Sequence, residues 1–181
     1  MFTIYSADVT GNPGNCSYPH KHVVLDEASL KAAVCHDYVC AEYQNSYRNG
    51  DNFIGSDCLP VDCDNDHSEN PEEWITPEDV LQQFPGVTFA VHFSRFNMRE
   101  KNGKAARPKF HVLFPIDYVT DPTLYSDIED FLKAFAKTSP SELRIKQSCL
   151  SLATSIPTQI MMNTSGVFVC LMLVPQDALL L

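Results

Sequence analysis

The sequence predicts an α+β fold, in which strand-like and helix-like segments alternate along one chain. Segments that alternate apolar and polar residues, typical of strands, are interleaved with segments whose apolar residues recur at helical spacing. The length of 181 residues, with 44% hydrophobic and 20% charged residues, is ordinary for one globular domain with one core. The interleaving alone also fits an α/β sandwich.

The first part of the chain contains one expected strand, one loop and one expected helix. Residues 2–5 alternate in polarity and predict a strand, followed by a loop rich in Gly, Asn and Pro that runs to Pro19. Apolar residues recur at helical spacing over 26–43, and Asp26 is a suitable N-cap. We therefore expect one helix there, leading to a turn at 47–50.

A second helix is expected to begin at Thr76, where a capping residue is followed by Pro77 and two acidic residues. It should end near Phe84. The elements predicted after it are a strand at 87–93, a basic excursion at 97–107, a strand at 110–114 and an amphipathic helix at 126–137.

Charge and cysteine content limit the classes of protein. The net charge of -10 argues against broad, unspecific attraction to nucleic acid, although a basic groove can exist on an acidic protein. The seven cysteines are odd in number and form no Cys-x-x-Cys pair, which favours a reduced cytoplasmic protein. The chain starts without a basic, apolar leader and has no run long enough to span a bilayer, so we expect no membrane association.

The segment Val61-Asp62-Cys63-Asp64 predicts a metal site. Side chains alternate along a strand, so Asp62 and Asp64 project together while Val61 and Cys63 point to the core. Two crowded carboxylates repel each other unless a cation neutralises them, and oxygen ligands suit Mg²⁺ or Mn²⁺. Both aspartates are therefore candidate metal ligands.

Basic residues and one histidine follow in the second half. His111 lies in an alternating strand, where a lone histidine is more often a buried core residue, but the acidic motif favours a ligand-binding role. Runs of basic residues usually form a solvated surface, and contact with phosphate is the alternative. The candidate phosphate-binding residues are Arg95, Lys101, Arg107 and Lys109.

Together these motifs resemble a known family. Asn52-Phe53, the run 61–74, Ser94-Arg95 and the run 107–111 resemble the catalytic core of archaeo-eukaryotic-type primases carried by phages, plasmids and integrative elements of bacteria. The resemblance covers residues 1–137. It implies an RRM-like core with a mixed or antiparallel sheet packed against helices, which polymerises nucleotides on a DNA template. The implied partners are nucleoside triphosphates, single-stranded DNA and a replicative helicase domain or protein.

The resemblance also implies roles for particular residues. Asp62 and Asp64 match an Asp-x-Asp pair that binds Mg²⁺ or Mn²⁺ with a third acid, and His111 matches a histidine that contacts the phosphates of the incoming nucleotide. The third acid has no match, because 138–143 occupies its place. The small hydroxyl residue that the family has two positions before the histidine is replaced by Lys109.

Composition changes sharply after Lys137. Of the 23 acidic residues only Glu142 and Asp177 follow it, and of the aromatic residues only Phe168. We expect residues 138–181 to be out of frame, with a divergent C-terminal hairpin as the alternative. In the first case the sheet would be incomplete at its C-terminal end, and catalysis would be impaired.

Two other functions stay open. The first is an EF-hand-like calcium loop at 62–73, since oxygen-bearing side chains occupy its ligand positions; however, His67 stands where the loop needs glycine, and Pro60 indicates a strand before it. The second is a remnant without catalysis that binds nucleotide or nothing.

Overall fold

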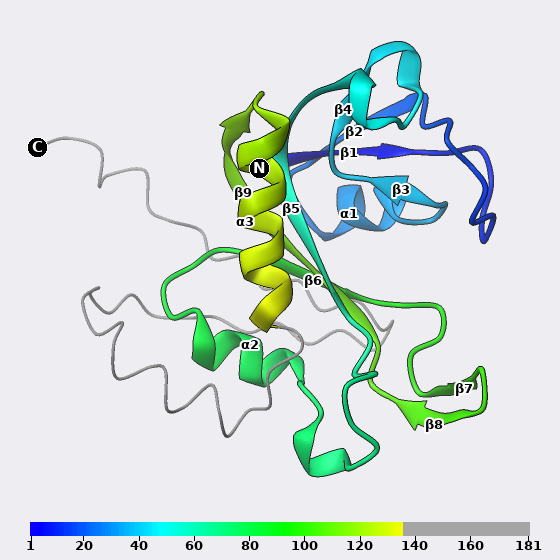
Figure 1. Cartoon of the computed structure of the whole chain (residues 1–181), viewed down its shortest axis with the longest axis vertical. Coiled ribbons are helices and arrows are strands. Elements are labelled where there is room, and N and C mark those ends of the chain that lie inside the picture. The colour runs from blue at the N-terminus through cyan, green and yellow to red at the C-terminus, as the bar shows by residue number, and fades with distance from the viewer. Residues whose placement is uncertain (136–181) are drawn as a thin grey trace, which may run out of the picture.

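The computed structural model of the chain describes residues 1–135 and confirms an α+β fold with antiparallel sheets and few helices (Figure 1). The central sheet has the strand order β4-β5-β9-β6, with bounds Glu42–Tyr43, Phe53–Cys63, Phe110–Val119 and Ala90–Phe93. A second sheet has the order β2-β1-β3, with bounds His20–Val24, Phe2–Ser6 and Tyr38–Val39. A hairpin joins β7 (Arg99–Lys101) and β8 (Lys104–Arg107). The predicted tail at 138–181 lies outside the described residues.

Within residues 1–135, three α-helices accompany the sheets: α1 (Glu27–Ala33), α2 (Pro77–Gln83) and α3 (Pro122–Phe135). Single 3₁₀ turns occur at Gln44–Ser46, Gly50–Asn52 and Pro71–Glu73. The start of α2 is fixed as predicted, because the Thr76 side chain accepts from the backbone of Asp79 while the Asp79 side chain accepts from the backbone of Thr76.

The pairing of β5 with β9 divides the core into two halves. One face of these strands carries Leu59, Val61 and Val112, which pack with residues of α2 and α3. The other face carries Cys58 and Leu113, which pack with β1 and α1. Both faces at this level are apolar because each is covered, as the near-continuous apolar sequence of β9 requires.

On the face that packs against β1 and α1, the strands β5 and β9 extend further than the elements that cover them. Beyond Leu113, the next residue of β9 on that face is His111, and its partner on β5 is Asp62. We call β1, β2, β3 and α1 the N-terminal unit; Figure 1 shows it at one end of β5, with the β7–β8 hairpin toward the other. Polar side chains of β5 and β9 therefore remain accessible beside the N-terminal unit.

The predicted helix at 26–43 is wrong beyond α1. After Ala33 the chain forms β3, which pairs with β1, and β4, which pairs with β5. Next to β3, Ala7 N donates to Asp37 O over 2.8 Å. Tertiary pairing thus overrides the helical spacing of the apolar residues.

Smaller corrections concern the other elements. The loop expected to reach Pro19 is followed by β2, which sequence analysis missed, and the basic excursion at 97–107 contains the β7–β8 hairpin. The strand expected at 87–93 begins at Ala90, β9 extends to Val119, and α3 begins at Pro122.

Two further features concern the described part of the chain. Its cysteines all carry free thiols, at positions Cys16, Cys35, Cys40, Cys58 and Cys63. Among residues 1–135, no helix is both long and apolar enough to cross a membrane. A cytoplasmic location stays a prediction.

We predict that Leu59→Ala lowers the free energy of unfolding by about 3 kcal/mol, because the Leu59 side chain on β5 is fully buried in the core that β5 forms with α2 and α3. Ile54→Ala is the matched control, since Ile54 lies on the same strand but is 42% exposed. Urea unfolding followed by circular dichroism measures both. Equal losses for the two variants would show that the face of β5 is assigned wrongly.

Candidate active site

The central pair of the candidate site is Asp62 and His111, which lie opposite each other on β5 and β9. Oδ1 of Asp62 is 3.6 Å from Nε2 of His111. Although 62% of the Asp62 side chain is exposed, the protein around it removes part of its water, and this raises its pKa. His111 counteracts the increase, while Asp64 adds to it. A cation bound here would relieve the remaining cost of ionising Asp62.

A second acid lies one step further along the same pairing. Lys109 lies just before β9 and precedes His111 by two residues, so in extended backbone both side chains project to the same side. The backbone continues the sheet there, because Ser94 N donates to Lys109 O over 2.9 Å. Nζ of Lys109 is 3.2 Å from Oδ1 of Asp64. Asp62 and Asp64 thus project to the same side, although Asp64 lies just beyond the end of β5, and of the two only Asp64 is paired with a lysine.

Two residues that sequence analysis missed complete the site. His92 lies on β6 opposite His111, and their ring centroids are 4.7 Å apart. The hydroxyl of Tyr38 is 2.7 Å from Nε2 of His92 and 2.6 Å from Nδ1 of His111. Burial, and next the neighbouring His111, lower the pKa of His92 to about 4, so this ring is neutral at pH 7.

The alternation Val91-His92-Phe93 was a signal for His92, since it has the same period as the strand around His111. Only the pairing of β6 with β9 shows that the two histidines are neighbours. Tyr38 carried no such signal, because it comes from the N-terminal unit and was assigned to a helix.

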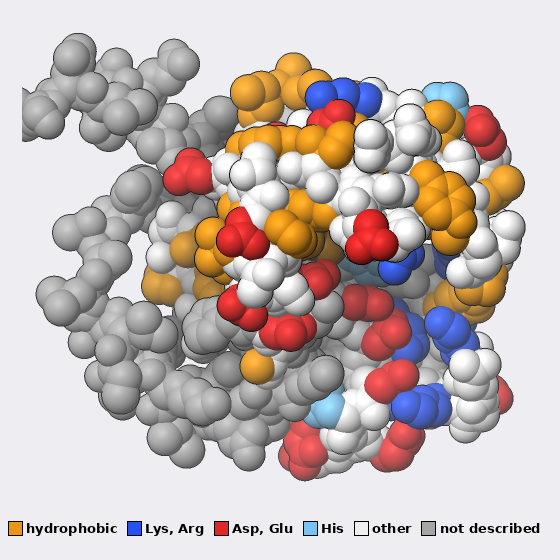
Figure 2. Space-filling view, turned by 45° about the horizontal axis from the view of Figure 1, so that its top comes forward, with side chains coloured by type: hydrophobic (Ala, Val, Ile, Leu, Met, Phe, Trp, Pro, Cys, Tyr) orange, Lys and Arg blue, Asp and Glu red, His pale blue; other side chains and the backbone are white. Residues whose placement is uncertain are grey.

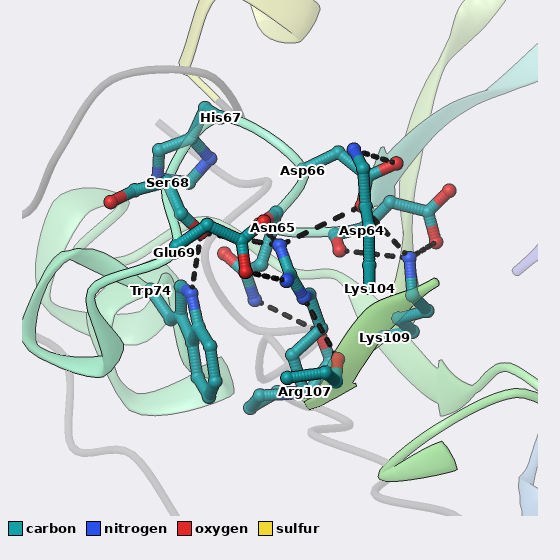
Figure 3. Close-up of polar contacts among 12 residues, drawn as sticks. Asp64, Asn65, Asp66, His67, Ser68, Glu69, Trp74, Lys104, Arg107 and Lys109 are labelled. Atoms are coloured by element: carbon teal, nitrogen blue, oxygen red, sulfur yellow. Dashed lines mark hydrogen bonds and ion pairs between the residues drawn. The ribbon is translucent and has the colours of Figure 1, made fainter. Parts of the chain in front are cut away.

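Arg107 holds the acidic loop, which we define as residues 64–74 (Figure 3). Its side chain is fully buried, and Nη1 donates to the carbonyl oxygens of Asn65 and Ser68 over 3.0 and 3.2 Å. Nη2 is 2.6 Å from Oε2 of Glu69, and the guanidinium lies 5.4 Å from the centre of the Trp74 ring. These contacts fix the loop that contains Asp64 and begins two residues after Asp62.

Asn65 and Asp66 attach the same loop to its surroundings. The Asn65 side chain donates to the carbonyls of Ile75 and Pro108, both over 2.9 Å, and its φ of 54° lies in the left-handed region that asparagine tolerates. Burial opposes ionisation of Asp66, but hydrogen bonds from Lys104 and Lys109 prevail and lower its pKa. Figure 2 shows the resulting mixture of acidic and basic side chains on one face.

The predicted phosphate-binding residues are thus divided by their surroundings. Arg107 and Lys109 are buried and hold backbone and carboxylate oxygens of the acidic loop. Arg95 is 48% exposed and its Nη2 is 2.6 Å from Oδ1 of Asp37. Lys101, on β7, places its ammonium 4.6 Å from the centre of the Phe96 ring. Phosphate binding by any of the four stays a prediction.

The described residues supply part of a metal site. Within residues 1–135, no group of three or more His, Cys, Asp or Glu side chains is arranged to hold an ion. Asp62 and Asp64 offer two carboxylates on the open face, so a cation there needs further oxygens, such as those of a ligand. In the acidic loop, Asp66 and Glu69 face lysine and arginine, and β5 leads into it as a strand. This arrangement does not favour a calcium loop.

The site is an open face of the sheet and differs from a hollow that lies where the N-terminal unit meets β4. This hollow of about 160 Å³ is lined by Tyr5, Lys21, Glu42 and Tyr43, among others, and by none of the site residues above. Searches of known protein families, curated proteins and solved structures gave no match to this chain.

We predict that Arg107→Met lowers the free energy of unfolding by about 2–4 kcal/mol, because buried carbonyl groups lose a charged donor. Lys104→Met is the control; its ammonium is 3.3 Å from Asp66 but 40% of its side chain is exposed, so the loss should stay below about 1 kcal/mol. Thermal and urea unfolding provide the comparison. If Arg107→Met leaves the free energy of unfolding unchanged, the acidic loop does not depend on this residue.

Proposed function

We propose that the chain contains a primase-type nucleotidyltransferase core, which binds a divalent cation and a nucleoside triphosphate on the open face of β5 and β9. The observation that carries the proposal is the cross-strand pair of Asp62 and His111, with Asp64 beside it on the same face. The reaction would be template-directed nucleotidyl transfer on single-stranded DNA, with an RRM-like core as its scaffold.

The chemistry explains why these residue types belong together. Transfer of a nucleotidyl group concentrates negative charge on phosphate oxygens, and Mg²⁺ or Mn²⁺ held by Asp62 and Asp64 would neutralise it. The raised pKa of Asp62 supports this role, because the protein's own positive groups do not compensate the carboxylate fully. The phosphates of the nucleotide would provide the further oxygens that the cation requires.

The basic side chains take two roles in this proposal. His111 contacts the phosphates through Nε2, the ring nitrogen nearest Asp62, which donates to a phosphate oxygen when the ring is protonated. Arg95 and Lys101 are partly exposed and serve the triphosphate or the template, whereas the buried Arg107 and Lys109 keep the acidic loop and Asp64 in place. A replicative helicase domain or protein as partner follows from the family resemblance alone.

A second candidate is nucleotide binding without transfer. Two carboxylates on the open face can help to bind one metal ion together with a nucleotide. A two-metal transfer reaction requires a third acid, which residues 1–135 do not place there, and this favours the second candidate. We therefore expect transfer by this chain to be weak or absent, while binding of the metal and the nucleotide persists.

We predict that nucleoside triphosphates bind the full chain in the presence of Mn²⁺ and that Asp62→Asn weakens this binding about tenfold or more, since the metal loses a charged ligand. Titration calorimetry measures the affinity, and Asp117→Asn is the control, because Asp117 is exposed on β9 outside the site. Extension of a labelled primer on single-stranded DNA then separates transfer from binding.

If the unaltered chain binds nucleotide and extends the primer, and Asp62→Asn abolishes the extension, the transferase is supported. If the chain binds nucleotide but does not extend the primer, the second candidate is supported. If a folded chain binds no nucleotide with either metal, or if Asp62→Asn binds as well as the unaltered chain, both candidates fail.

A further inference from the structure

We propose that Tyr38 and His92 are positioning residues that hold His111 in the tautomer with its proton on Nδ1. Nε2 of His111 is then the free nitrogen, which takes up the second proton of the ring and, once protonated, can donate to a ligand. The tautomer itself follows from contacts within the protein, while the use of Nε2 for nucleotide rests on the proposed function.

The argument begins at His92, whose proton can be located. Its Nδ1 lies 3.4 Å from the carbonyl oxygen of Phe93, which can only accept a hydrogen bond, so Nδ1 carries the proton. The ring is 7% exposed and neutral, and its Nε2 therefore has no proton. Nε2 must accept the hydrogen bond from the Tyr38 hydroxyl over 2.7 Å.

Tyr38 has a single hydroxyl proton, and it is donated to Nε2 of His92. At 2.6 Å from Nδ1 of His111, the Tyr38 oxygen can only accept, so Nδ1 of His111 carries a proton. The opposite assignment would leave Nδ1 of His92 unprotonated against the Phe93 carbonyl, with two acceptors facing each other. A hydrogen bond at one ring nitrogen thus determines the state of the other.

This arrangement gives His111 one free nitrogen with a fixed direction. Nε2 lies 3.6 Å from Asp62 on the open face, whereas Nδ1 is held from behind by Tyr38. Because Tyr38 belongs to β3, the N-terminal unit sets the orientation of a ring on the central sheet. Arg95 and Asp37 join the same two parts beside it.

The tautomer is measured on the full chain by ¹⁵N spectra of the histidine rings, at a pH where the spectrum shows His111 to be neutral. We expect Nδ1 of His111 to carry the proton in the unaltered chain. We expect Tyr38→Phe to populate the other tautomer. Tyr125→Phe is the matched control, because its partly buried hydroxyl donates to the carbonyl of Cys58 over 3.1 Å, outside this network. A proton on Nε2 of His111 in the unaltered chain would overturn the proposal, and this measurement requires no variant.

Binding of the Mn²⁺-nucleotide complex gives the functional comparison. We expect Tyr38→Phe to weaken it about fivefold and Tyr125→Phe to leave it unchanged. If Nδ1 of His111 carries the proton but the unaltered chain binds no nucleotide, the proposed function is wrong and the positioning role remains supported. Equal nucleotide affinity of Tyr38→Phe and the unaltered chain would refute the positioning role.

Discussion

The antiparallel register of β5 and β9 determines which side chains meet on the open face. It pairs Asp62 with His111, and continuing it by two residues brings Asp64 to Lys109. The same register turns Val61 and Val112 into the core under α2 and α3. A slip by one residue would bury the carboxylates and expose those apolar side chains, so packing of the core stabilises the geometry of the site.

Charge around the site is distributed unevenly, and this distinguishes its two aspartates. Buried Lys109 and Arg107 use their donors on Asp64 and the acidic loop, which makes the loop a rigid support. Asp62 faces an imidazole whose ring is held from behind by Tyr38. The aspartate without a lysine partner therefore lies on the exposed part of the sheet, where a cation has access to it.

The sequence predicted those parts of the site that depend on local alternation. The period of two placed Asp62 and His111 correctly on strands, whereas Asp64 lies directly after the end of β5; capping chemistry located α2. It could not predict His92 or Tyr38 as neighbours of His111, because their proximity arises from pairing between distant strands. The helix expected up to Tyr43 failed for the same reason, since backbone pairing of β3 with β1 and of β4 with β5 outweighs the spacing of apolar residues.

The most direct measurement of the central claim is paramagnetic broadening by Mn²⁺ in the NMR spectrum of the full chain, with a nucleotide that cannot be hydrolysed. If Asp62 and Asp64 hold the cation, signals from the end of β5 and from His111 should broaden most, and more strongly with nucleotide than without it. Broadening centred on the acidic loop near Glu73, or on the histidines of β2, would contradict the account.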